Sequence, residues 1–306
     1  MTGAGTRLAG SAGVDLRRTL DSGQAFRWRW DDRVSPVAVG VVGRRVVRLV
    51  QDDGGIRLLA PDTPEARETL RRYLGVTPRG GHPRRAEAAL AADPVLARVL
   101  AETTGIALLA QDPWEMLISF IVSQNNNIPK IRHSIERLAR ALGDPLDDGV
   151  AAFPSPERLA AASMPTLAAC ALGYRAPYVR AASRLVAAGR LNLAALSRLD
   201  HAAAREALLE VPGIGEKVGD CVLLFGLGHH AAFPVDVWVR RAVERLYFQG
   251  RARRLRDIQA FARERFGPLA GYAQQHLFAY ARARWRTAPS TPRTARERTV
   301  SSRGVS

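Results

Sequence analysis

Residues 209–238 read LEVPGIGEKVGDCVLLFGLGHHAAFPVDVW, and the helical part of the chain can be worked out from them. One helix ends near Leu209, and the turn VPGIG follows it. Apolar residues then recur at helical spacing at Val218, Val222 and Phe225. The pattern predicts two helices joined by a tight turn, which is a helix-hairpin-helix.

The turn of this hairpin has the chemistry of a phosphate site. Gly213 and Gly215 leave backbone amides uncovered at a helix N-terminus, where unpaired N–H groups and the helix dipole favour an anion. Lys217 lies in the first helical turn after the glycines. Further on, Asp236 precedes another helix, placed either to cap it or to project into a cleft. An amine and a carboxylate therefore accompany the predicted phosphate site.

These features resemble the helix-hairpin-helix/Gly-Pro-Asp superfamily of DNA base-excision glycosylases. Four further motifs narrow the resemblance to the 8-oxoguanine DNA glycosylase branch: SGQAFRW at 22–28, SQNNN at 123–127, LGYR at 172–175 and GYAQQHLF at 271–278. With the hairpin they occur in order over residues 14–282, which is nearly the whole chain. The resemblance implies an α+β fold, with an N-terminal antiparallel β-sheet domain followed by an α-helical helix-hairpin-helix body.

The charge of the chain agrees with a nucleic-acid partner. A formal net charge of +16 favours a polyanion, because cations that neutralise phosphates release counterions. Part of this charge reflects a general preference for Arg, since Lys130 and Lys217 are the only lysines among 45 basic residues. An amine can lose its proton and attack carbon, whereas a guanidinium cannot. The two lysines are therefore the candidates for a nucleophile.

Other features of the composition exclude several classes of protein. Cys170 and Cys221 are too few for a disulfide framework or an iron–sulfur site, so we expect a reduced intracellular protein, cytoplasmic or at the nucleoid. No apolar run is long enough to span a membrane. We expect a monomer that needs no metal or redox cofactor for its chemistry. The resemblance adds a hairpin that can hold a cation through its carbonyl oxygens.

The order of patterns along the chain predicts its domains. Residues 1–13 are rich in Gly, Ala, Ser and Thr and are predicted to be disordered. An N-terminal α/β domain is predicted over 14–110, a helical glycosylase domain over 111–285, and a disordered basic tail over 286–306. Within the first domain, β-branched runs separated by turns predict an antiparallel meander with strands at 37–42, 46–50 and 56–59. Helix starts are predicted where a capping residue precedes a proline, at Thr63, Asp93, Asp112 and Ser155.

The resemblance implies a mechanism as well as a fold. Lys217 would attack C1′ of the lesion nucleotide, and Asp236 would orient it and stabilise positive charge on the sugar. We prefer Lys217 to Lys130 because it stands beside the hairpin and matches the nucleophile of the family. The resulting imine would permit β-elimination. This predicts a bifunctional glycosylase and lyase that flips 8-oxoguanine out of double-stranded DNA.

The resemblance also assigns a pocket for the flipped base. The carbonyl of Gly23 would accept the N7 proton that 8-oxoguanine has and guanine lacks. Cys221 and Phe278 would enclose the two faces of the purine, and Gln274 would read its Watson–Crick edge. Each of these residue types has an ordinary structural role, and their joint occurrence in SGQAFRW and GYAQQHLF favours the functional one.

Five further residues are predicted to contact the duplex. By resemblance, Asn125 would fill the gap left by the extruded base, and Tyr174 and Arg175 would wedge the duplex and contact the orphan cytosine. Lys130 stands where the mammalian enzymes have an arginine, so the planar fork that reads a base edge is missing. Trp238 stands where they have a histidine, and an indole donates a single hydrogen bond. Stringency for the opposite base and lesion affinity are therefore open.

Two alternatives remain beside this hypothesis. The first is an enzyme that excises other oxidised or alkylated purines, against which Gly23 and Gln274 argue. The second is a non-catalytic DNA-binding hairpin protein, which would have no need of Lys217 together with Asp236.

Overall fold

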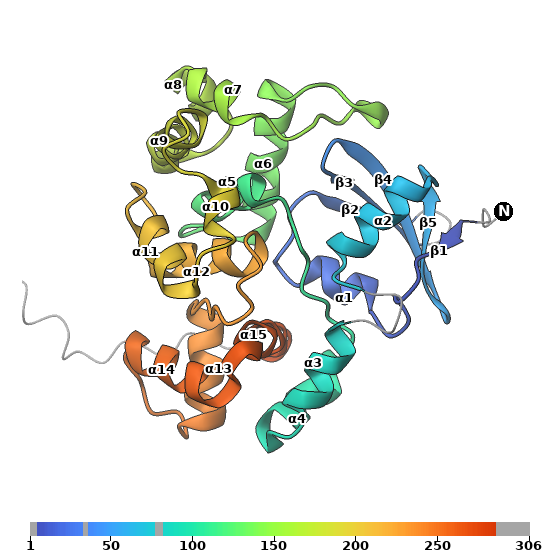
Figure 1. Cartoon of the computed structure of the whole chain (residues 1–306), viewed down its shortest axis with the longest axis vertical. Coiled ribbons are helices and arrows are strands. Elements are labelled where there is room, and N and C mark those ends of the chain that lie inside the picture. The colour runs from blue at the N-terminus through green and yellow to red at the C-terminus, as the bar shows by residue number, and fades with distance from the viewer. Residues whose placement is uncertain (1–4, 33–35, 77–81, 286–306) are drawn as a thin grey trace, which may run out of the picture.

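A computed structural model describes residues 5–32, 36–76 and 82–285 of the 306-residue chain. Within this part, an antiparallel sheet with short helices lies on one side of the molecule, and a larger helical body lies on the other (Figure 1). The α+β fold predicted from the sequence is therefore confirmed.

The sheet contains five strands in the order β1-β5-β4-β3-β2. They are β1 (Thr6–Arg7), β2 (Trp28–Asp31), β3 (Val37–Val42), β4 (Arg45–Asp52) and β5 (Gly55–Ala60). The predicted meander corresponds to β3, β4 and β5, where Val42 pairs with Arg45 and Asp52 pairs with Gly55 at the two tight turns. Strand β2 extends this meander on the side of β3, so SGQAFRW leads directly into the sheet.

The described part of the N-terminal segment is ordered, so the prediction of disorder over 1–13 is wrong there. Strand β1 pairs with β5, and the side chain of Leu8 is 1% exposed. Ser11 accepts a hydrogen bond from the backbone N–H of Ile56 at 2.9 Å. Low-complexity composition misled the prediction because the contacts that hold this segment are made with the distant strand β5 and are not encoded in the segment itself.

Helices α1 (Leu16–Asp21) and α2 (Pro64–Tyr73) lie against the sheet and close its hydrophobic core (Figure 1). The helical body follows, and its α-helices are α3 (His82–Leu90), α4 (Pro94–Thr103), α5 (Pro113–Val122), α6 (Ile128–Leu142), α7 (Pro156–Ala161), α8 (Met164–Ala169), α9 (Ala176–Ala187), α10 (Leu193–Leu196), α11 (His201–Leu209), α12 (Glu216–Phe225), α13 (Val237–Tyr247), α14 (Leu255–Phe266) and α15 (Ala270–Trp285).

The predicted helix starts are confirmed one by one. The side chains of Thr63, Asp93, Asp112 and Ser155 each accept a hydrogen bond from a backbone N–H in the first turn of α2, α4, α5 and α7. Proline follows each of them at the start of its helix. Such caps satisfy amide groups that have no partner inside the helix, which makes them strong local signals.

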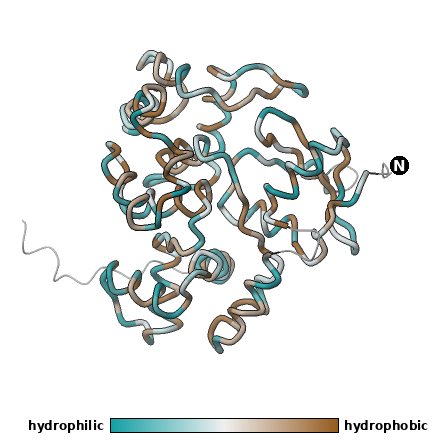
Figure 2. The backbone as a smooth tube through the Cα atoms, viewed as in Figure 1, coloured by the Kyte–Doolittle hydropathy of each residue, from teal (hydrophilic) through white to brown (hydrophobic). Residues whose placement is uncertain are grey.

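The core of the helical body is organised around α5, whose residues from Met116 to Val122 are all buried. Helices α3 and α4 belong to the same core, because Leu90, Leu96 and Val99 pack there and not against the sheet. Colouring by hydropathy shows brown and teal alternating along the helices, as amphipathic helices around a shared core require (Figure 2). No described helix has the length and hydrophobicity needed to cross a membrane.

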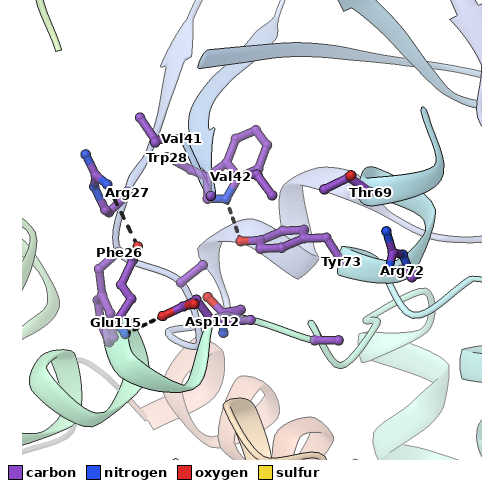
Figure 3. A pocket seen from close by; sticks show the side chains of 14 residues that line it. Phe26, Arg27, Trp28, Val41, Val42, Thr69, Arg72, Tyr73, Asp112 and Glu115 are labelled. Atoms are coloured by element: carbon purple, nitrogen blue, oxygen red, sulfur yellow. Dashed lines mark hydrogen bonds and ion pairs between the residues drawn. The ribbon is translucent and has the colours of Figure 1, made fainter. Parts of the chain in front are cut away.

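A cavity of about 250 Å³ lies where the sheet meets the helical body (Figure 3). Trp28 donates a hydrogen bond to the hydroxyl of Tyr73 at 2.8 Å across it. Arg27, from the sheet side, has Nη1 3.8 Å from Oε2 of Glu115 on α5 and also donates to the carbonyl of Ala151. Burial raises the pKa of Glu115 to about 7. A titratable group is thus enclosed at the junction between sheet and helices.

Candidate active site

A second cavity, of about 270 Å³, opens between α5, α6, α12, α13 and α15 and reaches the loop that precedes β2. Seven of the residues predicted for the site line it: Gly23, Lys217, Cys221, Asp236, Trp238, Gln274 and Phe278. They come from four segments that are far apart in sequence. The remaining predicted residues, Asn125, Lys130, Tyr174, Arg175, Gly213 and Gly215, are not part of the cavity lining.

Lys217 projects from the first turn of α12 and is partly buried. Its Nζ lies 3.1 Å from Oγ of Ser123, to which it donates a hydrogen bond, and 5.4 Å from the centroid of the Phe120 ring. Both partners come from α5 and its end, so the core helix of the body positions the amine. Lys130, by contrast, is exposed on α6. The geometry favours Lys217 as the nucleophile.

Asp236 caps helix α13 and lines the same cavity as Lys217. Its Oδ1 accepts hydrogen bonds from the N–H groups of Trp238, at 3.0 Å, and Val239, at 2.8 Å. Burial raises the pKa of the carboxyl group, and the two backbone hydrogen bonds and the charge of Lys217 oppose that rise. One side chain thus meets both expectations for this position, because it caps a helix and faces a cleft.

Cys221 from α12 and Gln274 from α15, which were predicted to contact the flipped base, line the same side of the cavity. Burial raises the pKa of the Cys221 thiol to about 12, so this group is a neutral thiol at physiological pH. Gln274 is 4% exposed, and its Oε1 is buried without a hydrogen-bond partner in the described structure. An unpaired buried acceptor costs on the order of 1–3 kcal/mol. A ligand that donates a hydrogen bond there would remove this cost.

Gly23 occupies a position that only glycine fits. Its φ of +83° lies in the left-handed region, and a Cβ at this residue would come within 3.0 Å of both Ile128 Cδ1 and Phe278 Cε1. The backbone of Gly23 is therefore packed closely against Ile128 and Phe278, which line the same cavity. This arrangement suits a main-chain carbonyl that contacts a ligand.

Three of the predicted duplex-contacting residues, Asn125, Tyr174 and Arg175, form a separate cluster outside the cavity. The side-chain amide of Asn125 donates to the hydroxyl of Tyr174 at 3.2 Å, and Tyr174 is 52% exposed. The guanidinium of Arg175 is buried and donates to the backbone carbonyls of Leu172, Gln124 and Asn125. In this structure Arg175 therefore organises the loop that carries Asn125, and its donors are directed at that loop.

The hairpin has the predicted geometry. Gly213 has a φ of +84°, and Gly215 caps α12 without a side-chain hydrogen bond, so the first amides of that helix receive no capping side chain. Because Lys217 is in the same helical turn, the hairpin and the cavity share one helix N-terminus. The cation that the resemblance implies at the hairpin stays a prediction.

Comparison with known proteins places this geometry in a family. The model of the 8-oxoguanine DNA glycosylase N-terminal domain matches residues 8–117, and the model of the HhH-GPD superfamily base excision DNA repair protein matches residues 118–268. A probable N-glycosylase/DNA lyase of Methanothermobacter thermautotrophicus is 37% identical over 213 residues, which are 62% of this chain and 68% of that protein. The chain belongs to the HhH-GPD superfamily of base excision DNA repair proteins.

Solved structures of HhH-GPD proteins superpose over most of the chain. MBOgg1 in complex with a low-affinity DNA ligand has a TM-score of 0.84 and 37% identity, covering 90% of this chain and 94% of that one. The Clostridium acetobutylicum 8-oxoguanine glycosylase/lyase, in complex with double-stranded DNA containing cytosine opposite 8-oxoguanine, has a TM-score of 0.83 and 32% identity. That match covers 88% of this chain and 92% of the clostridial one. The resemblance read from the motifs is therefore confirmed.

Among the residues of this HhH-GPD cavity that were not singled out from the sequence, two contact predicted site residues. Ser123 belongs to SQNNN, but its role as the hydrogen-bond partner of Lys217 depends on how α5 meets α12. Arg282 lines the cavity, with its guanidinium 5.4 Å from the Phe278 ring, and its charge opposes the rise in the pKa of Asp236. Its spacing of four residues from Phe278 was the available signal, since such residues share a helix face.

Proposed function

We propose that this chain excises 8-oxoguanine from duplex DNA and then cleaves the DNA strand at the abasic site. The observation that carries the proposal is the convergence of Lys217 and Asp236 on one cavity that also presents the unpaired Oε1 of Gln274. The names of its relatives support both activities, because one is a probable N-glycosylase/DNA lyase and another is an 8-oxoguanine glycosylase/lyase.

Base excision begins with extrusion of the nucleotide, since a base inside the duplex cannot be attacked. Unstacking costs a few kcal/mol, which contacts in the pocket and to the backbone offset. The unprotonated amine of Lys217 forms a bond to C1′ while the glycosidic bond breaks. The electron pair of the glycosidic bond leaves with the base, and the base takes up a proton. Positive charge develops on the sugar in this step, and the carboxylate of Asp236 stabilises it.

Strand cleavage follows from the covalent intermediate. Opening of the sugar ring gives an imine between Nζ of Lys217 and C1′, which acidifies the hydrogens on C2′. Loss of a C2′ proton forms a carbon–carbon double bond and expels the 3′ phosphate. Hydrolysis of the imine then releases Lys217.

The pocket reads the base through three kinds of contact. The Oε1 of Gln274 accepts a hydrogen bond from the N–H groups on the Watson–Crick edge of the purine. The carbonyl of Gly23 accepts the N7 proton, which guanine does not have. Phe278 and the neutral Cys221 thiol lie on the two faces of the ring. Asn125 and Tyr174 occupy the duplex at the place that the base has left.

The same cavity argues against a non-catalytic hairpin protein. Removing an amine and a carboxylate from water costs several kcal/mol per ion when burial is complete. Partial burial imposes a smaller desolvation cost. Binding to the phosphate backbone needs only exposed cations and the hairpin amides. Keeping Lys217 and Asp236 inside a cavity therefore serves chemistry and adds nothing to phosphate binding.

Borohydride trapping tests the proposal on a duplex that carries one 8-oxoguanine opposite cytosine. Wild type is expected to give a covalent protein–DNA adduct, and Lys217→Gln none. Lys130→Gln is the matched control and is expected to keep the adduct, because its side chain is exposed outside the cavity. Base release without an adduct in wild type would refute the imine mechanism, and no release at all would refute the assigned lesion.

This function would place the protein with genomic DNA, at the nucleoid or in the cytoplasm around it, where it acts as a monomer. Fluorescence of a tagged chain, compared with a nucleoid stain, tests the location. Sedimentation of the purified protein, alone and with a lesion duplex, tests the oligomeric state. A stable dimer without DNA would refute the monomeric state.

A further inference from the structure

Helix α15 presents two adjacent buried amides toward the active site. Gln274 and Gln275 are 4% and 2% exposed, and both line the catalytic cavity. Buried polar side chains require a reason, because an unpaired amide is costly in the interior. For Gln274 the reason is recognition of the base, as proposed above. Gln275 has a different partner, which lies in the N-terminal part of the chain.

The side chain of Gln275 holds the peptide that precedes Gly23. Its Nε2 donates a hydrogen bond to the backbone carbonyl of Ser22 at 3.0 Å, across 253 residues of sequence. This carbonyl belongs to the peptide unit that joins Ser22 to Gly23. Since a peptide unit is planar, fixing its oxygen also fixes the direction in which the chain enters Gly23.

The chain is also held where it leaves Gly23. The Gln111 side chain donates to the backbone carbonyl of Gln24 at 2.8 Å. The Gln24 side chain donates to the carbonyl of Ala107 at 2.8 Å and accepts from the N–H of Leu109 at 2.9 Å. Glycine is the most flexible residue in a chain, so a recognition carbonyl on Gly23 needs such constraints on both sides. The upstream constraint comes from α15, which also carries Gln274.

We propose that Gln275 is a positioning residue that sets the Gly23 carbonyl at a fixed distance from the Gln274 amide. One helix would then hold both edges of the recognition pocket, with Gln274 directly against the base and Gln275 acting through the Ser22–Gly23 peptide. A hydrogen-bonding constellation has to be held to within about 0.5 Å to discriminate. Selection of 8-oxoguanine through its N7 proton therefore depends on Gln275. The inference rests on the proposed function.

Comparison of two reactions of the same enzyme separates positioning from general structural support. Gln275→Leu keeps the side-chain volume close to that of Gln and removes the donor. Excision of 8-oxoguanine opposite cytosine, measured in single turnovers, is expected to fall at least about tenfold, the effect of about 1.4 kcal/mol. Strand cleavage at a preformed abasic site is expected to stay within about twofold of wild type on the same scale, because no base is read there.

Two further variants complete the design. Gln275→Asn keeps the amide but is one methylene too short to reach Ser22. It replaces the leucine variant if that variant does not fold, and it is expected to show the same slower excision with unchanged strand cleavage. Gln259→Leu is the matched control, because that amide donates to Asp220 at 3.2 Å and is not part of the cavity lining. It is expected to leave both reactions unchanged.

The other possible outcomes distinguish failure of the role given to Gln275 from failure of the proposed substrate. An equal fall in both reactions would show that Gln275 only supports the fold and would overturn the inference, as would no change in either. Wild type that cleaves abasic sites but does not release 8-oxoguanine would instead refute the proposed substrate. The two failures are therefore distinguishable in one set of assays.

Discussion

At the scale of single residues, the site depends on side chains that meet two demands at once. Asp236 caps α13 through Oδ1 and lines the same cavity as Lys217. The cap is a local feature, whereas the proposed role of the charge is to stabilise the reacting sugar. A substitution that keeps one of these properties and removes the other can separate them.

Asp236→Asn keeps a capping side chain and removes the negative charge. Because asparagine is as good an N-cap as aspartate, the melting temperature is expected to change little. Base excision is expected to slow by on the order of 10²–10³, as for removal of other groups that stabilise transition-state charge. Asp236→Ala removes the cap as well and is expected to lose a further ~1 kcal/mol of stability. Thermal melting and single-turnover excision measure the two effects, and an asparagine variant with wild-type rate would refute the electrostatic role.

At the scale of the element, the hairpin uses its two glycines for different reasons. Gly213 has a left-handed backbone, and a Cβ on it would lie 2.3 Å from Cγ of Tyr178. Gly215 has a φ of −97°, and a Cβ there would have no neighbour within 4 Å. The turn therefore requires glycine at 213 for its shape, whereas glycine at 215 leaves the helix N-terminus open to a phosphate.

Gly213→Ala is expected to destabilise the protein by about 2–4 kcal/mol, because the strained backbone and the clash with the Tyr178 ring add up. Gly215→Ala is the matched control in the same turn, and its cost is expected to stay below about 1 kcal/mol. Urea denaturation of both variants checks the difference. Equal losses of stability would contradict the separate roles given to the two glycines.

At the scale of the whole molecule, the sheet domain and the helical body meet at a mostly buried titratable group. Glu115 has a pKa raised to about 7 by burial, from an ordinary value of 4.5. The folded state therefore keeps its proton up to about pH 7, whereas the unfolded chain loses it near pH 4.5. Because the folded state binds more protons between these values, this group makes stability fall as pH rises from 4.5 to 7.

Glu115→Gln is expected to remove this component of the pH dependence. Between pH 5.5 and pH 8, wild type should lose about 2 kcal/mol of unfolding free energy relative to the variant, at about 1.36 kcal/mol per pH unit up to the pKa. Urea denaturation of both proteins at the two pH values measures this difference, in which the contributions of other titrating groups cancel. Parallel pH dependences would show that Glu115 is ionised in the folded protein at both values.

The features that could be predicted from the sequence are those that depend only on residues close together in the chain. The caps at Thr63, Asp93, Asp112 and Ser155, the strands of the meander and the glycine turn before Lys217 each depend on a few adjacent residues, so their patterns survive without knowledge of the fold. The motifs also indicated the family, and the family resemblance predicted seven of the residues that line the cavity.

Long-range packing determined the rest. The bond from Lys217 to Ser123 spans 94 residues, and that from Gln275 to Ser22 spans 253. The pairing of β1 with β5, the missing partner of Gln274 Oε1 and the burial of Glu115 likewise depend on which segments meet. Local propensity carries no information about such meetings, because their free energy comes from surfaces buried between distant elements. Short motifs in the sequence therefore identify the candidate reacting groups, whereas the distances between these groups and their protonation are determined only by the folded chain.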